Sequence, residues 1–309
     1  MTRGALLMTY GSPDSLERDE VAAYLARVRG GRASDSGLVD EFARRYRVIG
    51  GSPLIGITRD QAAVLSDELG WPVEIGMRFS EPSIERGLRA LSEAGVTDVA
   101  AIILSPQYSP LLMGGYARAI HAASEALGSA APMTTVADAW HEEPAFVEAI
   151  AARTRGSLDH LDSEERASTH VLMTAHSLPR RVAEQEPEYL AQLHATAEAV
   201  ATAAGLIHDD WTFCWQSAGH EPGEWMTPDF SELMPTIAAA GRGNVLVVPV
   251  QFLADHLETL YDVDIGAREQ AERAGLRFSR AASLGADGGL AVALASTARR
   301  TLGDPVAAR

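Results

Sequence analysis

Eight short runs of apolar residues constrain the fold of this 309-residue chain more than any other feature. Longer segments with a helical pattern separate these runs. Such alternation is typical of βα units whose strands join in parallel sheets. We therefore expect an α/β protein with strands near residues 4–10, 73–79, 99–105, 133–138, 169–175, 211–215, 244–250 and 276–281.

The length favours two domains, because 309 residues are long for one core and comfortable for two of about 150. We expect a division into residues 1–150 and 151–309, with helices that cross over near the junction and at the C-terminus. A weak internal similarity agrees with two similar halves, although strand-turn segments also resemble each other by chance. It pairs LLMTYGSP (6–13) with VLMTAHSLP (171–179), and LSPQYS (104–109) with VPVQFL (248–253).

Three pairs of residues have the spacing of a reciprocal helix cap, in which a side chain at each position bonds the backbone of the other. They predict helix starts at Asp14 with Glu17, at Thr58 with Gln61, and at Asp229 with Glu232. Two glycines, Gly95 and Gly205, follow helical patterns and predict C-terminal ends.

Charge and cysteine content exclude several classes of function. The chain has 42 acidic and 26 basic side chains, a formal charge of −16, which opposes binding to the phosphate backbone of a nucleic acid. It has a single cysteine, Cys214, so it forms no intrachain disulfide. For the same reason this chain alone cannot supply four cysteines to an iron-sulfur cluster.

We expect a cytoplasmic location. Residues 1–11 contain a single arginine and too short an apolar run for a signal peptide. No apolar stretch of about 18 residues is present to span a bilayer, although peripheral contact with a membrane stays open.

Two segments place polar side chains where an apolar run ends. In the first, VLMTAHSLP, His176 follows the run directly, and the carboxyl ends of strands are where open α/β sheets place their chemistry. Imidazole accepts a proton or binds a metal near neutral pH. In the second, VVPVQFLADHLETLYDVD, Glu258 and Asp262 are four apart and share one face if the segment is helical. Together the two segments indicate proton removal coupled to metal handling.

With the rest of the chain, these segments resemble the ferrochelatases, the enzymes that insert Fe(II) into a porphyrin. The resemblance covers nearly the whole length, and its seven motifs occur in family order. They are LLMTYGSPDS (6–15), YRVIGGSPL (46–54), GMRFSEPSIE (76–85), SPQYS (105–109), AHSLP (175–179), CWQSAGHEPGEWMTPD (214–229) and ADHLETLYDVDI (254–265).

The resemblance implies a fold of two similar Rossmann-like domains with parallel sheets, of the chelatase type, and a porphyrin cleft between them. It also implies a lyase of haem biosynthesis with Fe(II) as substrate and no required cofactor. The expected partners are a porphyrin, either coproporphyrin III or protoporphyrin IX, and ferrous iron. A transient iron donor or haem acceptor protein stays open, as does the oligomeric state.

In the ferrochelatase arrangement, His176 is the proton acceptor or first metal contact, and Glu258 is the opposing carboxylate. Fe(II) accepts both ligand types, and the sequence does not divide the two duties between them. Asp262 extends the carboxylate line as a further metal contact. Gly266 breaks that line, because many ferrochelatases have glutamate there. Either the relay is shorter here, or Asp264 or Glu269 substitutes, and we favour Asp264 as a solvated helix charge.

A porphyrin requires an apolar slot with polar or cationic groups at its edge for the propionates. Arg78 is the favoured propionate contact, because it lies at the end of the strand VEIGMRF and arginine binds carboxylates through two donors. The full set of expected porphyrin contacts is Tyr10, Arg29, Ser52, Arg78, Met113, Ser217 and Trp225.

Asp14 is a second departure from the family pattern, since some cluster-free relatives carry a tyrosine there that can reach iron. The choice between coproporphyrin and protoporphyrin therefore stays open. Two other functions are retained as alternatives. One is a chelatase for another metal or tetrapyrrole, such as a cobaltochelatase, and the other is a noncatalytic carrier of porphyrin or haem.

Overall fold

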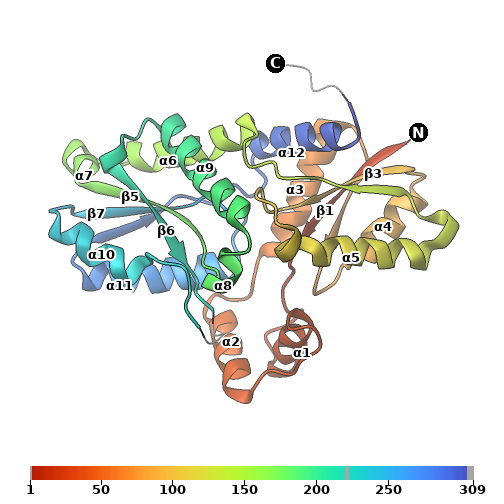
Figure 1. Ribbon diagram of the computed structural model, residues 1–309, viewed down its shortest axis with the longest axis horizontal. Helices are drawn as coiled ribbons and strands as arrows, with labels where there is room; N and C mark the ends of the chain where they lie inside the picture. The colour runs from red at the N-terminus through yellow and green to blue at the C-terminus, as the bar shows by residue number, and fades with distance from the viewer. Residues whose placement is uncertain (1, 220–222, 305–309) are drawn as a thin grey trace. The chain divides into compact units, whose positions relative to one another are not determined.

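The computed structural model describes residues 2–219 and 223–304, and within them the strands form two parallel sheets of four strands each (Figure 1). The α/β class and all eight predicted strands are confirmed. The first sheet contains β1 (Arg3–Thr9), β2 (Val73–Met77), β3 (Asp98–Ile103) and β4 (Met133–Val136). The second contains β5 (Thr169–His176), β6 (Trp211–Gln216), β7 (Asn244–Pro249) and β8 (Arg277–Arg280).

The two sheets have the same strand order, β2-β1-β3-β4 in one and β6-β5-β7-β8 in the other. The internal similarity of the sequence falls on matching strands. One pair of similar segments covers the ends of β1 and β5 and the residues after them. In the other pair, residues 104–109 follow β3 directly, and residues 248–253 begin with the last two residues of β7. The similarity therefore coincides with a repeated topology, as the expectation of two similar domains requires.

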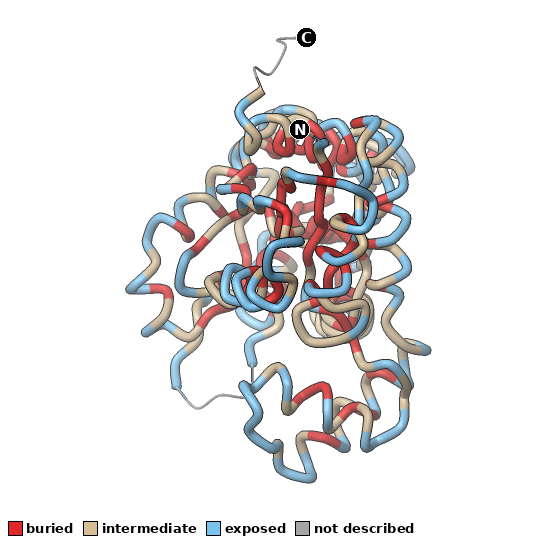
Figure 2. The backbone as a smooth tube through the Cα atoms, turned by 90° about the vertical axis from the view of Figure 1, so that its right-hand side faces the viewer, coloured by how far each residue is buried: buried red, intermediate tan, exposed pale blue. Residues whose placement is uncertain are grey.

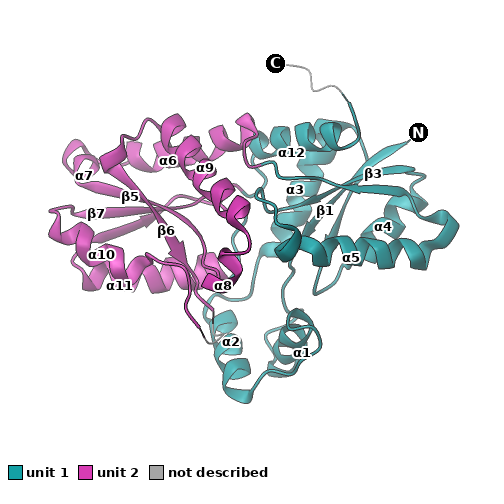
Figure 3. Cartoon of the chain, viewed as in Figure 1, with its two compact units in different colours: residues 1–140, 254–257, 285–309 teal, residues 141–253, 258–284 magenta. Residues whose placement is uncertain are grey.

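Contacts divide the chain into two compact units (Figure 3). Unit 1 comprises residues 1–140, 254–257 and 285–309, and unit 2 comprises residues 141–253 and 258–284. The division expected after residue 150 falls inside the helix Pro144–Asp159, and it stays a prediction. No helix in the described part of the chain is long and apolar enough to cross a membrane.

In unit 1, helices cover both faces of the sheet, and the central strands β1 and β3 are buried, whereas the edge strand β4 is not (Figure 2). Helix α3 packs with α12, and α4 packs with α5, while α1 and α2 pack against each other (Figure 1). The bounds are α1 (Arg18–Val28), α2 (Ser36–Val48), α3 (Leu54–Leu69), α4 (Ile84–Glu93), α5 (Pro110–Leu127), η1 (Gly128–Ala130) and α12 (Gly288–Thr301).

In unit 2, α6 packs with α9, and α11 packs with α10, η3 and β8. A buried apolar cluster joins β5, β6 and β7 to α10, η3 and α11, and it includes Met234 and Val263. The bounds are α6 (Pro144–Asp159), α7 (Ser163–Ala167), α8 (Arg180–Ala183), α9 (Pro187–Ala204), η2 (His208–Asp210), α10 (Phe230–Ala239), η3 (Glu258–Ala267) and α11 (Arg268–Arg273).

The predicted helix ends have mixed outcomes. Asp229 accepts the backbone N–H groups of the first turn of α10, which confirms that start, and Gly95 and Gly205 follow their helices with left-handed backbone. The other two starts are wrong. Helix α1 follows Glu17 without a side-chain cap, and Thr58 lies inside α3, where its hydroxyl donates to the carbonyl of Leu54. At these two positions, the spacing of a reciprocal cap occurs without a helix start.

Candidate functional site

His176 is the last residue of β5, and its backbone is fixed from two directions. Its N–H donates to Gln251 Oε1 at 2.9 Å, and Gln251 Nε2 donates to the hydroxyl of the buried Tyr189 at 2.5 Å. The next N–H, of Ser177, donates to the carbonyl of Gln216 at 2.7 Å. The end of β5 is therefore tied to the segment after β7, to α9 and to β6.

The hydrogen bonding of the imidazole decides which nitrogen is reactive. Nδ1 of His176 contacts the carbonyl oxygen of Ser177, and a carbonyl can only accept. Nδ1 therefore carries the proton, and in the neutral ring Nε2 has the free lone pair. Nε2 lies 3.6 Å from Glu258 Oε2, and the two side chains are 32% and 31% exposed.

Glu258 Oε2 is buried and receives no hydrogen bond from the described residues. The Nε2 lone pair and this oxygen are both acceptors, so the neutral histidine and the carboxylate face each other without a donor between them. A buried acceptor without a donor is costly. A proton on Nε2 or a metal cation bound by both groups removes that cost, so the pair is arranged to take up a positive charge.

Glu258 begins η3, a π-helix, so the segment is helical, which is the condition that the sequence analysis set for a shared face. Its buried residues, Thr259, Val263 and Ala267, recur every four positions and pack toward the core of unit 2. The residues directly before these three form a second row, which is partly exposed. They are Glu258, Asp262 and Gly266. The carboxylates of Glu258 and Asp262 thus follow one another along one side of the π-helix.

Packing does not require a glycine at the third position of this row. A Cβ on Gly266 would meet only the carbonyl oxygen of Tyr261, at an ordinary 3.7 Å. The missing carboxylate is therefore a chemical difference from the family pattern and not a steric necessity.

The expectation that Asp264 is a solvated helix charge is wrong. Its two oxygens accept from Nε and Nη2 of Arg280 on β8, at 2.7 and 2.9 Å. The Arg280 side chain is only 10% exposed, so this pair is largely shielded from water. The pair joins η3 to β8. Glu269, the other acid considered as a substitute, is exposed on α11.

Trp225 and Ser217 lie near the end of β6. The Trp225 ring centroid is 6.4 Å from that of His176, and its backbone bridges to Pro179. Its indole occupies the space beside Gly219, where a Cβ would come within 2.7 Å. Ser217 has φ of 58°, a left-handed conformation that is uncommon for a residue with a side chain. Residues 220–222 of the motif around them lie outside the described residues.

Arg78 directly follows β2, and its backbone N–H donates to the carbonyl of Thr9 at the end of β1. The guanidinium lies 4.6 Å from the ring centroid of Phe79 and 5.2 Å from that of Tyr116. Among the described residues, no carboxylate pairs with it. Burial above all raises the pKa of Tyr116, so this phenol stays neutral and offers the cation a ring instead of an anion.

The other residues expected to contact porphyrin in unit 1 are more dispersed. Tyr10, which follows β1, is 45% exposed and packs edge-on against Phe79 at 4.6 Å. Met113 is buried in α5. Arg29 is exposed at the end of α1, and Ser52 accepts the N–H of Leu54 at 3.4 Å. In the described chain, no hydrogen bond links Arg29 or Ser52 to Arg78.

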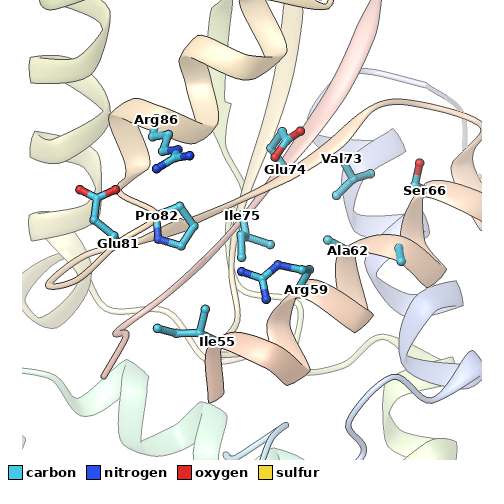
Figure 4. Close-up of a pocket in the computed structure, with 11 residues that line it drawn as sticks. Ile55, Arg59, Ala62, Ser66, Val73, Glu74, Ile75, Glu81, Pro82 and Arg86 are labelled. Atoms are coloured by element: carbon cyan, nitrogen blue, oxygen red, sulfur yellow. The ribbon is translucent and has the colours of Figure 1, made fainter. Parts of the chain in front are cut away.

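A hollow of about 640 Å³ lies on unit 1 between α3, β2 and the start of α4 (Figure 4). Two arginines, Arg59 and Arg86, line it with apolar residues such as Ile75. None of the residues that the sequence analysis selected lines this hollow. The candidate site is therefore assigned from its chemistry and not from the size of a cavity.

The sequence analysis did not select several residues that shape the site. Gln251 and Tyr189 hold the backbone of His176, and Phe79, Tyr116 and Gly115 surround Arg78. One signal was available: the glutamine of VPVQFL matches that of SPQYS in the internal repeat. The role of Gly115 had no signal, because it depends on a side chain 37 positions earlier in the sequence.

Among the described residues, no group of three or more His, Cys, Asp or Glu side chains is arranged to hold a metal ion. Cys214 is a free thiol in the core, and burial above all raises its pKa.

Comparison with known proteins gives one consistent result. The family model described as Ferrochelatase matches residues 2–302. A ferrochelatase of Deinococcus radiodurans is 37% identical over 290 residues, covering 92% of this chain and 91% of its own. A coproporphyrin III ferrochelatase of Geobacillus thermodenitrificans is 35% identical, covering 90% and 89%.

Solved structures support the fold. SirB from Bacillus subtilis with Fe³⁺ superposes with a TM-score of 0.59 at 14% identity, covering 98% of this chain and 96% of its own. At that identity the likeness extends to the chelatase fold alone.

The pair formed by Asp264 and Arg280 generates a prediction about stability. We expect Asp264→Asn to lower the free energy of unfolding by about 1.5–3 kcal/mol, because it leaves a largely buried guanidinium without its carboxylate. Denaturant unfolding measures this, with the exposed Glu269→Gln as control. Equal stability of the two variants would show that the pair contributes little.

Proposed function

This chain belongs to the ferrochelatase family, and we propose that it inserts Fe(II) into a porphyrin at His176 and Glu258. The observation that carries the proposal is the pair of facing acceptors, Nε2 of His176 and the buried Oε2 of Glu258, 3.6 Å apart. The chain is thus a lyase of haem biosynthesis. Its reaction requires a proton acceptor and metal ligands, and we propose that this pair provides both.

Metal insertion replaces two pyrrole N–H protons by Fe(II), so the enzyme must accept two protons for each haem formed. The free lone pair on Nε2 of His176 takes each proton in turn. Ser177 holds the opposite side of the ring through its carbonyl, and Glu258 stabilises the imidazolium. Each proton then passes to solvent before the next is taken, which the one-third exposure of both side chains allows.

Fe(II) binds imidazole and carboxylate, so the same groups serve the metal. We assign metal contact to His176, Glu258 and Asp262, with Asp262 one step farther along η3. Because Asp264 is committed to Arg280 and position 266 has no side chain, the proposed carboxylate line ends at Asp262. Fe(II) enters here as substrate.

For the porphyrin, we propose that Arg78 contacts a propionate, because it is a cation without a carboxylate partner in the described chain. Arg29, Ser52 and Ser217 complete the proposed polar contacts. The apolar contacts are Tyr10, Met113 and Trp225. We favour coproporphyrin III as the substrate, since relatives from Geobacillus bear that name, with protoporphyrin IX as the alternative.

The remaining parts of the proposal concern the cofactor, the location and the partners of the enzyme. No iron-sulfur cluster is required, in keeping with the single cysteine, Cys214, in the core. We also propose that the enzyme works in the cytoplasm with a porphyrin and ferrous iron as its partners. A transient haem acceptor or iron donor protein is compatible with this proposal.

The alternatives are separable by one assay. Solved relatives of this fold include a sirohydrochlorin chelatase in complex with cobalt, at 14% identity. Absorption spectra of the protein mixed with porphyrin and either Fe(II) or Co(II) distinguish an iron enzyme, a cobalt enzyme and a carrier. Conversion with Fe(II) supports the proposal, whereas porphyrin binding without conversion would support a carrier.

We expect His176→Ala to reduce metal insertion at least about 100-fold, the contribution of a positioned acid-base group, while the protein stays folded and binds porphyrin. The exposed His208→Ala is the matched control and should keep full activity. Turnover of the His176 variant above about a tenth of wild type would remove His176 from its central role.

Glu258→Gln should severely reduce turnover with little change in porphyrin affinity. The amide keeps the shape of the carboxylate, but its NH₂ can donate to Nε2 of His176 and occupy the lone pair. Asp262→Asn should have a milder effect, because that carboxylate lies one step farther from the imidazole. Steady-state kinetics with direct porphyrin titration measure both variants. A larger loss at Asp262 would invert the order assigned to the two acids.

Arg78→Ala should raise the KM for a propionate-bearing porphyrin by about 10-fold to 150-fold, with a smaller effect on kcat. This corresponds to a charge-assisted hydrogen bond of about 1.5–3 kcal/mol. Arg86→Ala, an exposed arginine of α4, is the control. Esterifying the propionates should erase the difference between wild type and variant.

Equal affinity of both proteins for the free acid would make Arg78 structural. In the same assay, a preference for a porphyrin with four propionates over one with two would identify coproporphyrin as the substrate.

A further inference from the structure

The guanidinium of Arg78 occupies the space that a side chain at position 115 would fill. A Cβ built on Gly115 would lie 1.9 Å from Nη2, 2.2 Å from Cζ and 2.6 Å from Nε of Arg78. Cβ atoms do not approach other atoms so closely. Any residue other than glycine at this point of α5 must displace the guanidinium.

The rings of Phe79 and Tyr116, together with the backbone of Gly115, form a seat for the Arg78 guanidinium. Both centroids lie within cation–π range of the guanidinium, at 4.6 and 5.2 Å. No carboxylate pairs with Arg78 in the described chain, so ring faces and helix backbone hold the cation without neutralising it. The donors not turned toward the seat then stay available for an external carboxylate.

Apart from this contact, a glycine at position 115 destabilises helix α5. A glycine inside a helix is less stable than an alanine, and α5 has two in succession, Gly114 and Gly115. Their surroundings differ. A Cβ on Gly114 would meet only Nη1 of Arg118, at 3.4 Å. Of the two, only position 115 has a packing reason to lack a side chain.

We propose that Gly115 is a positioning residue, whose missing side chain seats the Arg78 guanidinium against α5 and sets its orientation toward the carboxylate of the substrate. The proposal extends the function proposed for Arg78 and rests on it for its effect on substrate. Alanine at 115 favours the helix, and the atoms that it displaces belong to a flexible side chain. Stability and function should therefore change in opposite directions.

The test compares Gly115→Ala with Gly114→Ala. Both variants should keep or raise the Tm of wild type, because both replace a helical glycine. Only Gly115→Ala should raise the KM for a free-acid porphyrin, by about 10-fold or more, as expected for loss of the Arg78 contact, with a smaller change in kcat. A KM within about threefold of wild type in Gly115→Ala would overturn the proposal.

A double variant shows whether Gly115 acts through Arg78. Arg78→Ala with Gly115→Ala should bind porphyrin no worse than Arg78→Ala alone, because the displaced group is already absent. Effects that simply add would overturn the positioning role.

A readout without substrate separates this proposal from the function of Arg78. The ¹⁵N-detected Nε–H resonance of Arg78 should shift in Gly115→Ala and stay in place in Gly114→Ala. An unchanged resonance in Gly115→Ala would contradict the proposal that Gly115 positions the guanidinium. If Arg78→Ala binds porphyrin as wild type does, the proposed propionate contact fails, while a shifted resonance still supports the seat itself.

Discussion

The hydrogen bond from Nδ1 of His176 to the carbonyl of Ser177 decides which side of the imidazole can react. It leaves the lone pair on Nε2, and that lone pair faces the buried oxygen of Glu258. The parallel pairing of β5 with β6 and β7 makes this arrangement possible, because it fixes the backbone on both sides of the histidine. The Ser177 N–H bonds to β6, and the His176 N–H bonds to Gln251 after β7.

The second partner, Glu258, depends on the way η3 is held. The buried row of this π-helix packs into the core of unit 2, and the Asp264–Arg280 pair ties it to β8. Those contacts leave the row of Glu258 and Asp262 partly exposed. π-Helical turns occur often at functional sites, and here the irregular helix carries the two acids of the proposed site.

The two units share a strand order but carry different chemistry at the carboxyl ends of their strands. In unit 1 these ends present a cation and aromatic rings, with Arg78, Phe79 and Tyr10 following β1 and β2. In unit 2 they present a base and acids, with His176 at the end of β5. A repeated topology thus supports two different duties, since loop residues vary while the buried strands keep the framework.

The sequence alone was sufficient for the eight strands, their parallel class and the repeat. It also selected His176 and Glu258 as site residues, and their roles stay a proposal. All of these depend on local patterns: apolar runs, their spacing, and polar residues at the point where a run ends. The family followed from seven motifs along the chain, and comparison with known proteins agrees.

Only the tertiary structure decided which groups pair over a distance. It placed Asp264 against Arg280, 16 positions away, where the sequence suggested a solvated charge. It also began η3 as a π-helix, chose the reactive nitrogen of His176, and set Arg78 against the bare backbone of Gly115. Asp264–Arg280 and Arg78–Gly115 share one physical reason. Periodicity records which face of an element is buried, whereas the partner of a buried polar group is set by elements that pack together from distant parts of the chain.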